Sequence, residues 1–425
     1  MHFSGSLTQI ALVAVAALLG GMLLTRLKQP AILGYVCAGI ILGPSGLRFV
    51  ENREGITLLA ELGILLLLFL IGLELDIQAF KRQWKVSLTA ACLQILISLF
   101  LVVVTAQFFG AGLGLSMLIG FIGALSSTAV AVKVLESTGE LKTSVGKSVL
   151  GILIAQDLAF VPMILLIRGF GEEGFSYLTL VKVFMSVGFL GFLIYFLSKK
   201  GQYKIPFSHY VKGDLDMIPL AALAFCFALS SLSGLLGLSA AYGAFIAGLM
   251  MGNSQHQKTM VQATHPIQSI LMMVFFLSIG LLLDLKFIYA NLALVLTLLV
   301  LVSLVKTILN IGILHFLRFS WKEAFLSGAI MAQLGEFSFL LAAVGREINL
   351  LDEMGGKLVV ALTALSLVFS PLWLGLVRRL KTLKMASAIS LTDFLERVFP
   401  SEFAWGRKGV HLFKKRYKSL KNRDI

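Results

Sequence analysis

Long apolar runs dominate this chain, and they restrict it to folds that cross a lipid bilayer many times. A spanning helix needs about 20 mostly apolar residues, because each residue adds ~1.5 Å to a helix and the hydrocarbon core is ~30 Å thick. Thirteen segments meet or approach this length: residues 6–25, 31–47, 56–75, 86–109, 113–135, 147–168, 178–197, 215–233, 236–252, 267–284, 287–316, 323–345 and 357–377. Only 14% of all residues are charged, against about 25% in soluble domains. The sequence therefore predicts an all-α polytopic membrane protein whose first helix is retained rather than cleaved as a signal.

Basic residues are distributed unevenly between the two sides of the predicted bundle. Fifteen Lys and Arg residues lie in or beside alternate loops on one side, and seven lie on the other. Because cytoplasmic loops carry the excess of Lys and Arg, we predict an outer N-terminus and a cytoplasmic C-terminus in a bacterial inner membrane. Thirteen more basic residues follow position 377, so residues 381–425 are expected to form a basic cytoplasmic tail near anionic lipid. This placement accounts for the net charge of +14 without a nucleic-acid partner.

The chain matches itself at separations of 208 and 209 residues. Residues 69–76 match 277–284, residues 122–128 fall opposite 330–336, and residues 38–45 match 247–254. Seven predicted helices separate the two copies, so the second copy enters the membrane from the opposite side. We therefore predict inverted six-helix repeats over residues 1–168 and 215–380, joined by a linker helix over 178–197. Transporters built this way bind their substrates near the membrane midplane, often at interrupted helices.

A carboxylate lies in the middle of the apolar segment 147–168. Burying an ionised Asp at bilayer depth costs at least ~2.5–3.5 kcal/mol, so such residues usually mark an ion or proton path. Asp157 is therefore the first candidate for a transport site, with Gln156 beside it. A permanent structural ion pair is the alternative role. Lys306, in the middle of segment 287–316, is the expected partner, and a pair that forms and separates would respond to protons and cations.

Two repeat-related segments contain polar interruptions. They are Ser126, Ser127 and Thr128 in segment 113–135, and Gln333, Gly335 and Glu336 in segment 323–345. Unwound backbone at such sites exposes carbonyl groups to cations and helix N-termini to anions. The hydroxyl residues also suit plain helix packing. Glu336 either binds a cation or accepts backbone N–H bonds at the break, and both interpretations stay open.

Several functional classes lack their motifs in this sequence. The six His residues do not cluster with Cys or acidic residues at metal spacing, and neither a phosphate-binding glycine-rich loop nor a potassium-channel filter occurs. We therefore expect a transporter rather than an enzyme, with no cofactor and no bound metal apart from the transported ions. Asp76 and Asp284, which end the first matched pair of segments, are interpreted as helix caps or anchors.

Six short motifs together resemble the Kef-type branch of the monovalent cation:proton antiporters, over nearly all of residues 1–380. The motifs are residues 72–76, 125–129, 156–157, 275–284, Lys306 and 335–338. Runs at residues 25–30 and 150–157 resemble a subgroup that includes a magnetosome-associated protein once proposed to move iron. Kef-type proteins usually continue into a cytoplasmic nucleotide-binding domain, whereas this sequence has the basic tail. Either that regulation is absent, a separate regulatory subunit supplies it, or the sequence is part of a longer chain.

The resemblance implies an NhaA/NapA-like fold and a homodimer, in which each protomer has a dimer domain and a mobile core crossed by two discontinuous helices. It implies that Asp157 binds a cation and a proton in turn, close to Ser127 and Thr128, and that Lys306 is the core lysine. Gln156 occupies the position where electrogenic sodium relatives carry a second Asp, which implies electroneutral exchange with K⁺ favoured over Na⁺. Elevator-type antiport is the leading hypothesis. A gated potassium efflux channel and an iron transporter are the alternatives.

Overall fold

The structure, a computed structural model, is helical throughout most of the chain it describes. It describes residues 3–26, 31–49, 62, 65–66, 68–73, 77–170, 177–200, 217–236, 238, 240–254 and 257–382. The helices are α1 (Phe3–Arg26), α2 (Ala31–Leu42), α4 (Ile77–Phe108), α5 (Leu113–Ala124), α6 (Thr128–Ser137), α7 (Ser144–Arg168), α8 (Tyr177–Lys200), α10 (Met217–Leu235), α11 (Ala240–Gly252), α12 (Gln257–Leu282), α13 (Leu285–Ala290), α14 (Leu292–Phe316), α15 (Trp321–Ile330), α16 (Phe337–Glu347) and α17 (Glu353–Thr382). The chain divides into two compact units, residues 1–370 and 371–425. The helices that carry the candidate site lie in the first unit.

Seven helical stretches in the described part of the chain are long and apolar enough to cross a membrane. They are Trp84–Phe108, Leu113–Glu136, Ser144–Arg168, Met217–Leu235, Met260–Leu281, Leu292–Phe316 and Glu353–Ser370. Four shorter apolar stretches accompany them, in α1, α2, α8 and α11. This agrees with the prediction of an all-helical polytopic membrane protein. Most of the predicted segment 56–75, Asp76 and the tail from residue 383 onward lie outside the described residues.

Several of the predicted segments have different boundaries in the structure. Helix α4 begins at Ile77 rather than at residue 86, and α2 ends at Leu42 rather than at residue 47. Helix α12 begins at Gln257 rather than at residue 267, and the predicted segment 287–316 is divided, because α13 ends before Asn291 and α14 begins after it. Asp284 is the N-cap of α13, where its Oδ1 accepts a hydrogen bond from Phe287 N at 3.0 Å. A carboxylate in this position satisfies a backbone N–H at the helix start. The interpretation of Asp284 as a cap is confirmed.

Two helix pairs, α5–α6 and α15–α16, are interrupted at the polar residues noted in the sequence. The backbone is extended at Leu125 and Ser127, between α5 and α6, and six residues separate the end of α15 from the start of α16. The two interruptions touch. Gly335 N donates to Leu125 O at 3.1 Å, and a Cβ on Gly335 would lie 3.0 Å from the Ser126 carbonyl oxygen. A larger residue at position 335 would therefore push the two interruptions apart.

Close glycine contacts join helices from the two halves of the chain. A Cβ on Gly39 of α2 would overlap the backbone of α12 next to Gly280, and a Cβ on Gly248 of α11 would overlap the backbone next to Gly72. Small residues allow helix backbones to approach closely within a membrane, where packing rather than hydrophobicity holds helices together. The two contacts are related by the internal match, since Gly39 corresponds to Gly248 and Gly72 corresponds to Gly280.

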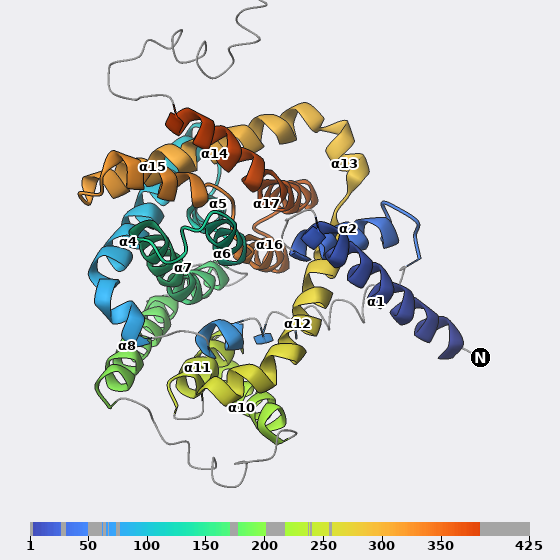
Figure 1. The fold of residues 1–425 in the computed structure, drawn as a ribbon, viewed down its shortest axis with the longest axis horizontal. Coiled ribbons are helices and arrows are strands. Elements are labelled where there is room, and N and C mark those ends of the chain that lie inside the picture. Colours follow the sequence, from blue (N-terminus) through green and yellow to red (C-terminus); the bar gives the residue numbers. More distant parts are fainter. Residues whose placement is uncertain are drawn as a thin grey trace, which may run out of the picture. The chain divides into compact units, whose positions relative to one another are not determined.

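The helices around the two interruptions pack on one another. Helix α4 packs against α5 and α7, α14 packs against α15 and α4, and α16 packs against α5 and α7. Figure 1 shows α4, α14, α15 and α16 gathered around α5, α6 and α7, whereas α2 lies between α1 and α12 and packs against both. The two helix interruptions therefore lie among α4, α7 and α14, and polar side chains on those three helices can reach them.

Candidate functional site

The two interruptions, residues 125–127 and 331–336, meet next to α7, and this place is called the crossing. Asp157 lies on α7 at the crossing. Its side chain is buried, and its Oδ2 accepts a hydrogen bond from Thr128 Oγ1 at 3.0 Å. Thr128 is the first residue of α6, so the carboxylate faces the N-terminal end of that half-helix, where the helix dipole favours negative charge. The apolar sequence on either side of Asp157 keeps α7 within the protein interior and brings the carboxylate with it.

Ser127 and Gln333 connect the two interruptions beside this carboxylate. Ser127 is the N-cap of α6, where its Oγ accepts from Val130 N at 3.3 Å, and its carbonyl oxygen accepts from Gln333 Nε2 at 3.3 Å. The other polar atom of the Gln333 amide, Oε1, is buried and has no hydrogen-bond partner among the described residues. The crossing therefore offers one amide oxygen that a cation would satisfy.

Glu336 is the second buried carboxylate of the crossing. It precedes α16, but its side chain makes no capping hydrogen bond to that helix. Its Oε2 is buried without a partner in the described part of the chain. The carboxylate lies beside the Ser127 hydroxyl, and close enough to Asp157 for the two charges to repel each other. The carboxylate also lies within reach of the backbone N–H groups of Glu336 and of Ala129, in the first turn of α6. The geometry is therefore compatible with both interpretations of Glu336, backbone contacts at the break and a cation at Oε2.

Lys306 does not form the expected ion pair with Asp157. Its Nζ instead donates to Gly123 O at 2.8 Å and to Leu125 O at 2.6 Å, at the C-terminal end of α5. The physical reason is that the interruption leaves the last carbonyl groups of α5 without helical partners, and an ammonium group both satisfies them and faces the negative end of the helix dipole. No ion pair to Asp157 or Glu336 is formed by any described Lys, Arg or His.

Gln156 is less available to an ion than the sequence indicated. Its Oε1 accepts from Ser126 N at 2.9 Å, and its Nε2 donates to Gln94 Oε1 at 2.8 Å. The side chain of Gln94 in turn donates to Asn310 Oδ1 at 2.9 Å. The sequence analysis missed Gln94 and Asn310. The available signal was that each is an uncharged amide within a long apolar segment, where a polar group needs a partner.

The atoms at the crossing that could bind a cation are all oxygens, and they belong to two carboxylates, hydroxyls, backbone carbonyls and an amide. Such a set suits hard cations. Two buried carboxylates with no ion-paired base become neutral by taking up protons or a cation, so the arrangement can exchange one for the other. Among the described residues, no three His, Cys, Asp or Glu side chains form a group that could hold a metal ion.

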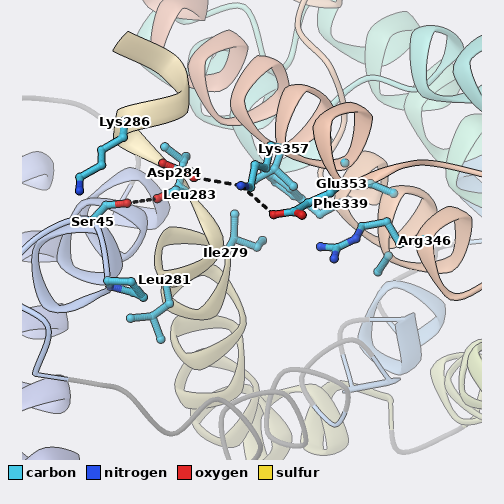
Figure 2. Close-up of a pocket in the computed structure, with 15 residues that line it drawn as sticks. Ser45, Ile279, Leu281, Leu283, Asp284, Lys286, Phe339, Arg346, Glu353 and Lys357 are labelled. Atoms are coloured by element: carbon cyan, nitrogen blue, oxygen red, sulfur yellow. Dashed lines mark hydrogen bonds and ion pairs between the residues drawn. The ribbon is translucent and has the colours of Figure 1, made fainter. Parts of the chain in front are cut away.

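A separate cavity of about 350 Å³ lies between α12–α13 and α16–α17. Figure 2 shows Lys357 of α17 between two carboxylates, and its Nζ lies 3.2 Å from Asp284 Oδ2 and 2.8 Å from Glu353 Oε1. Asp284 lies beyond the spanning stretch of α12, and the Phe287 N–H and then the Lys357 ammonium lower the pKa of its carboxyl. None of the residues predicted for the ion site lines this cavity.

Three relatives are similar to most of this chain. It is 47% identical to the iron transporter MagA of Paramagnetospirillum magneticum, over 93% of this chain and 91% of that protein. It is 31% identical to K(+) efflux antiporter 5 of Arabidopsis thaliana, over 93% of this chain and 69% of that protein. It is 29% identical to the glutathione-regulated potassium-efflux system protein KefC of Salmonella typhi, over 84% of this chain and 58% of that protein.

The fold also has a solved counterpart. The sodium proton antiporter MjNhaP1 of Methanocaldococcus jannaschii superimposes with a TM-score of 0.68 at 18% identity, over 90% of this chain and 100% of that one. At this identity the likeness concerns the fold alone. The model of the family described as sodium/hydrogen exchanger, transmembrane, matches residues 13–379. The chain therefore belongs to the sodium/hydrogen exchanger family, among its Kef-type and MagA-like cation:proton antiporters.

Proposed function

We propose that the protein exchanges a monovalent cation, preferably K⁺ and also Na⁺, for a proton across a bacterial inner membrane, with Asp157 as the carrier of both. One observation carries this proposal: Asp157 and Glu336 are both buried, close enough for their charges to interact, and no described basic side chain forms an ion pair with them. A charge that is buried without a counter-charge is costly, so an empty site takes up either a proton or a cation. The two ligands then compete for one carboxylate, which is the requirement for obligatory exchange.

The oxygen donors of the crossing and the relatives support an alkali cation as the partner of the proton. Thr128 Oγ1, the Gln333 Oε1 atom and the carboxylates supply oxygens without sulfur or imidazole, and alkali cations are bound through oxygen. Two of the named relatives are described as potassium efflux proteins. MagA is described as an iron transporter, so Fe²⁺ belongs among the ions to be tested.

The neutral side chain next to the carrier supports electroneutral exchange. Gln156 occupies the position beside Asp157, and both ends of its amide are used in hydrogen bonds within the protein. Exchange of one cation for one proton at Asp157 leaves the charge of the site unchanged. The rate is then insensitive to the membrane potential, in contrast to an exchanger that moves unequal charges.

The repeat-related glycine contacts support the finer architecture that we propose. It has thirteen spans and inverted repeats over residues 1–168 and 215–380, with the helix over 178–197 between them. An elevator movement carries the helices around the two interruptions past the helices that pair two protomers in a homodimer. The N-terminus lies outside, the basic tail over 381–425 lies in the cytoplasm, and regulation comes from a separate subunit if it is present.

The test is proton movement in vesicles that contain the purified protein and an internal pH dye. An imposed K⁺ gradient is expected to change the internal pH with wild-type protein and not with Asp157→Asn. Glu347→Gln is the matched control, because Glu347 is an exposed acid that pairs with Arg168 far from the crossing, and it is expected to retain full exchange.

Three outcomes contradict the proposal. K⁺ flux without proton movement would indicate a gated channel, and Fe²⁺ uptake that requires Asp157 would indicate an iron transporter. Full exchange by Asp157→Asn would show that the carrier lies elsewhere.

A further inference from the structure

Three buried amide side chains connect one helix interruption to the other. Ser126 N donates to Gln156 Oε1 at 2.9 Å, Gln156 Nε2 to Gln94 Oε1 at 2.8 Å, Gln94 Nε2 to Asn310 Oδ1 at 2.9 Å, and Asn310 Nδ2 to Met331 O at 3.2 Å. Ser126 Oγ also donates to Met331 O at 2.9 Å. The hydrogen bonds therefore form a closed ring, here called the amide ring, of Gln94, Gln156, Asn310, Ser126 and the Met331 carbonyl group.

The amide ring is isolated from solvent. Gln94 and Gln156 are each 1% exposed, and Asn310 is 3% exposed. Both the oxygen and the nitrogen of every amide in the ring have a partner within it. A buried polar network of this kind is rigid when every group is satisfied, and it becomes costly when one member is removed. The three amides come from α7, α4 and α14, so the ring ties three helices to the two interruptions.

The two ends of the ring determine which way each amide points. The Ser126 backbone N–H can only donate, and the Met331 backbone C=O can only accept. Between a fixed donor and a fixed acceptor, a chain of amides has one arrangement in which every donor meets an acceptor. Gln94 therefore keeps the Gln156 oxygen on Ser126. Without Gln94, the Gln156 Nε2 is buried without an acceptor, and turning the amide over would set Nε2 against the Ser126 N–H. Neither orientation satisfies both ends of the Gln156 amide, so its hold on Ser126 weakens.

We propose that Gln94 and Asn310 are positioning residues that set the cation affinity and the K⁺/Na⁺ preference of the Asp157 site. They act through Gln156, which anchors Ser126, and the residues that follow Ser126 supply oxygens next to the carboxylate. The inference rests on the proposed function, in which Asp157 holds the cation. Selection between two alkali cations depends on where the surrounding oxygens are held, so a looser interruption weakens binding and reduces discrimination.

The first experiment needs no transport. Amide hydrogen exchange is measured by mass spectrometry on peptides that cover residues 121–131, in the wild type, Gln94→Leu, Asn310→Leu and the double variant. Ser98→Ala is the matched control, because Ser98 is a buried residue on α4, one turn from Gln94, whose Oγ donates to Gly120 O at 2.9 Å outside the ring. We expect amide hydrogen exchange in these peptides to be about tenfold faster in the ring variants, which corresponds to the loss of one net hydrogen bond.

The second experiment measures proton-coupled K⁺ and Na⁺ exchange in vesicles with the same variants. The KM for K⁺ is expected to rise about tenfold and the K⁺/Na⁺ preference to approach one. A merely structural role would lower the amount of folded protein, and with it Vmax, but would leave KM and the ion preference unchanged. Because the ring acts as one unit, the double variant is expected to resemble either single variant rather than to show the product of their effects.

The failures of the two proposals are distinguishable. If wild-type protein moves no protons, the proposed function fails, and hydrogen exchange still decides whether the ring holds the interruption. If wild-type exchange requires Asp157 but folded Gln94→Leu keeps the wild-type KM and ion preference, the inference is overturned. Equal hydrogen exchange in Gln94→Leu and Ser98→Ala also overturns it, because the interruption would then not depend on the ring.

Discussion

The contacts of Lys306 lead to a quantitative prediction for its replacement by an apolar residue. In Lys306→Met, Gly123 O loses its donor, whereas Leu125 O keeps the hydrogen bond from Gly335 N. One buried carbonyl group is thus left without a partner in the described structure, at a cost of about 1–3 kcal/mol. The ammonium also faces the C-terminal end of α5, an interaction that contributes up to ~2 kcal/mol in buried geometries. Removal of a buried charge offsets part of this, so we expect a net loss of about 1–3 kcal/mol in the free energy of unfolding.

An ion pair between Lys306 and Asp157 would give a different result. Breaking such a pair leaves an uncompensated buried carboxylate and costs about 3–5 kcal/mol, and neutralising the carboxylate would relieve that cost. The two arrangements are therefore separated by the double variant Lys306→Met with Asp157→Asn. The carbonyl contacts predict that the two single effects add to within about 0.5 kcal/mol. The ion pair predicts that Asp157→Asn rescues Lys306→Met.

The assay is equilibrium unfolding in mixed micelles with increasing SDS, applied to the wild type, both single variants and the double variant. Lys306→Arg serves as the control, because it keeps the positive charge and hydrogen-bond donors for the α5 carbonyl groups. It is expected to lose less stability than Lys306→Met. A double variant that is more stable than Lys306→Met alone would refute the assignment of Lys306 to the end of α5.

Two further predictions concern the glycine contacts and the separate cavity that Asp284 and Lys357 line. Gly248→Ala places a methyl group against the Phe69 backbone and is expected to cost about 1–3 kcal/mol in the same unfolding assay. Gly188→Ala, in open space on α8, is expected to be neutral or slightly stabilising. Equal losses of stability in the two variants would contradict the close contact at Gly248. Asp284→Asn keeps a cap for α13 but loses the ion pair with Lys357, which is partly exposed and worth about 0.2–1 kcal/mol. Because the pKa of Asp284 is lowered in the folded state, its contribution is present above the unfolded pKa of about 3.9 and is lost as the pH falls through the folded value. The free energy of unfolding is measured for the wild type and Asp284→Asn at pH 7 and at acid pH. The difference between the two proteins should disappear in acid, and a difference that persists there would contradict the role of the ionised carboxylate.

The features of the fold that depend on hydropathy were predictable from the sequence. Apolar length indicated most of the described helices, and the hydroxyls at 126–128 together with Gly335 indicated the two interruptions. Where the boundaries were wrong, the cause was local chemistry within an apolar segment. Asp284, for example, caps the start of α13, and Asn291 Nδ2 donates to Phe287 O at 3.0 Å at the end of that helix. Both lie inside or beside residues that a hydropathy average treats as continuous.

The hydrogen-bond partners of the polar side chains at the site were less predictable, because most of them are backbone atoms. Lys306 was paired with Asp157 on the ground that a buried charge needs an opposite charge, but carbonyl groups at an interrupted helix end satisfy an ammonium as well. Every residue type contributes the same carbonyl group, so the sequence does not mark these acceptors. They become visible only when the end of a helix is located in three dimensions.

The same reasoning explains why Gln94 and Asn310 were missed and why their role is specific. Their amides are separated by 216 residues in sequence and meet because α4 and α14 both pack around the crossing. Once Lys306 is assigned to α5, the carboxylate of Asp157 has no competing ammonium contact, and the properties of the site depend on the oxygens that surround it. Those oxygens are held by the interruption at Ser126, and the interruption is held by the amide ring. The buried amides, rather than a second charge, are therefore the features of this chain that should distinguish one alkali cation from another.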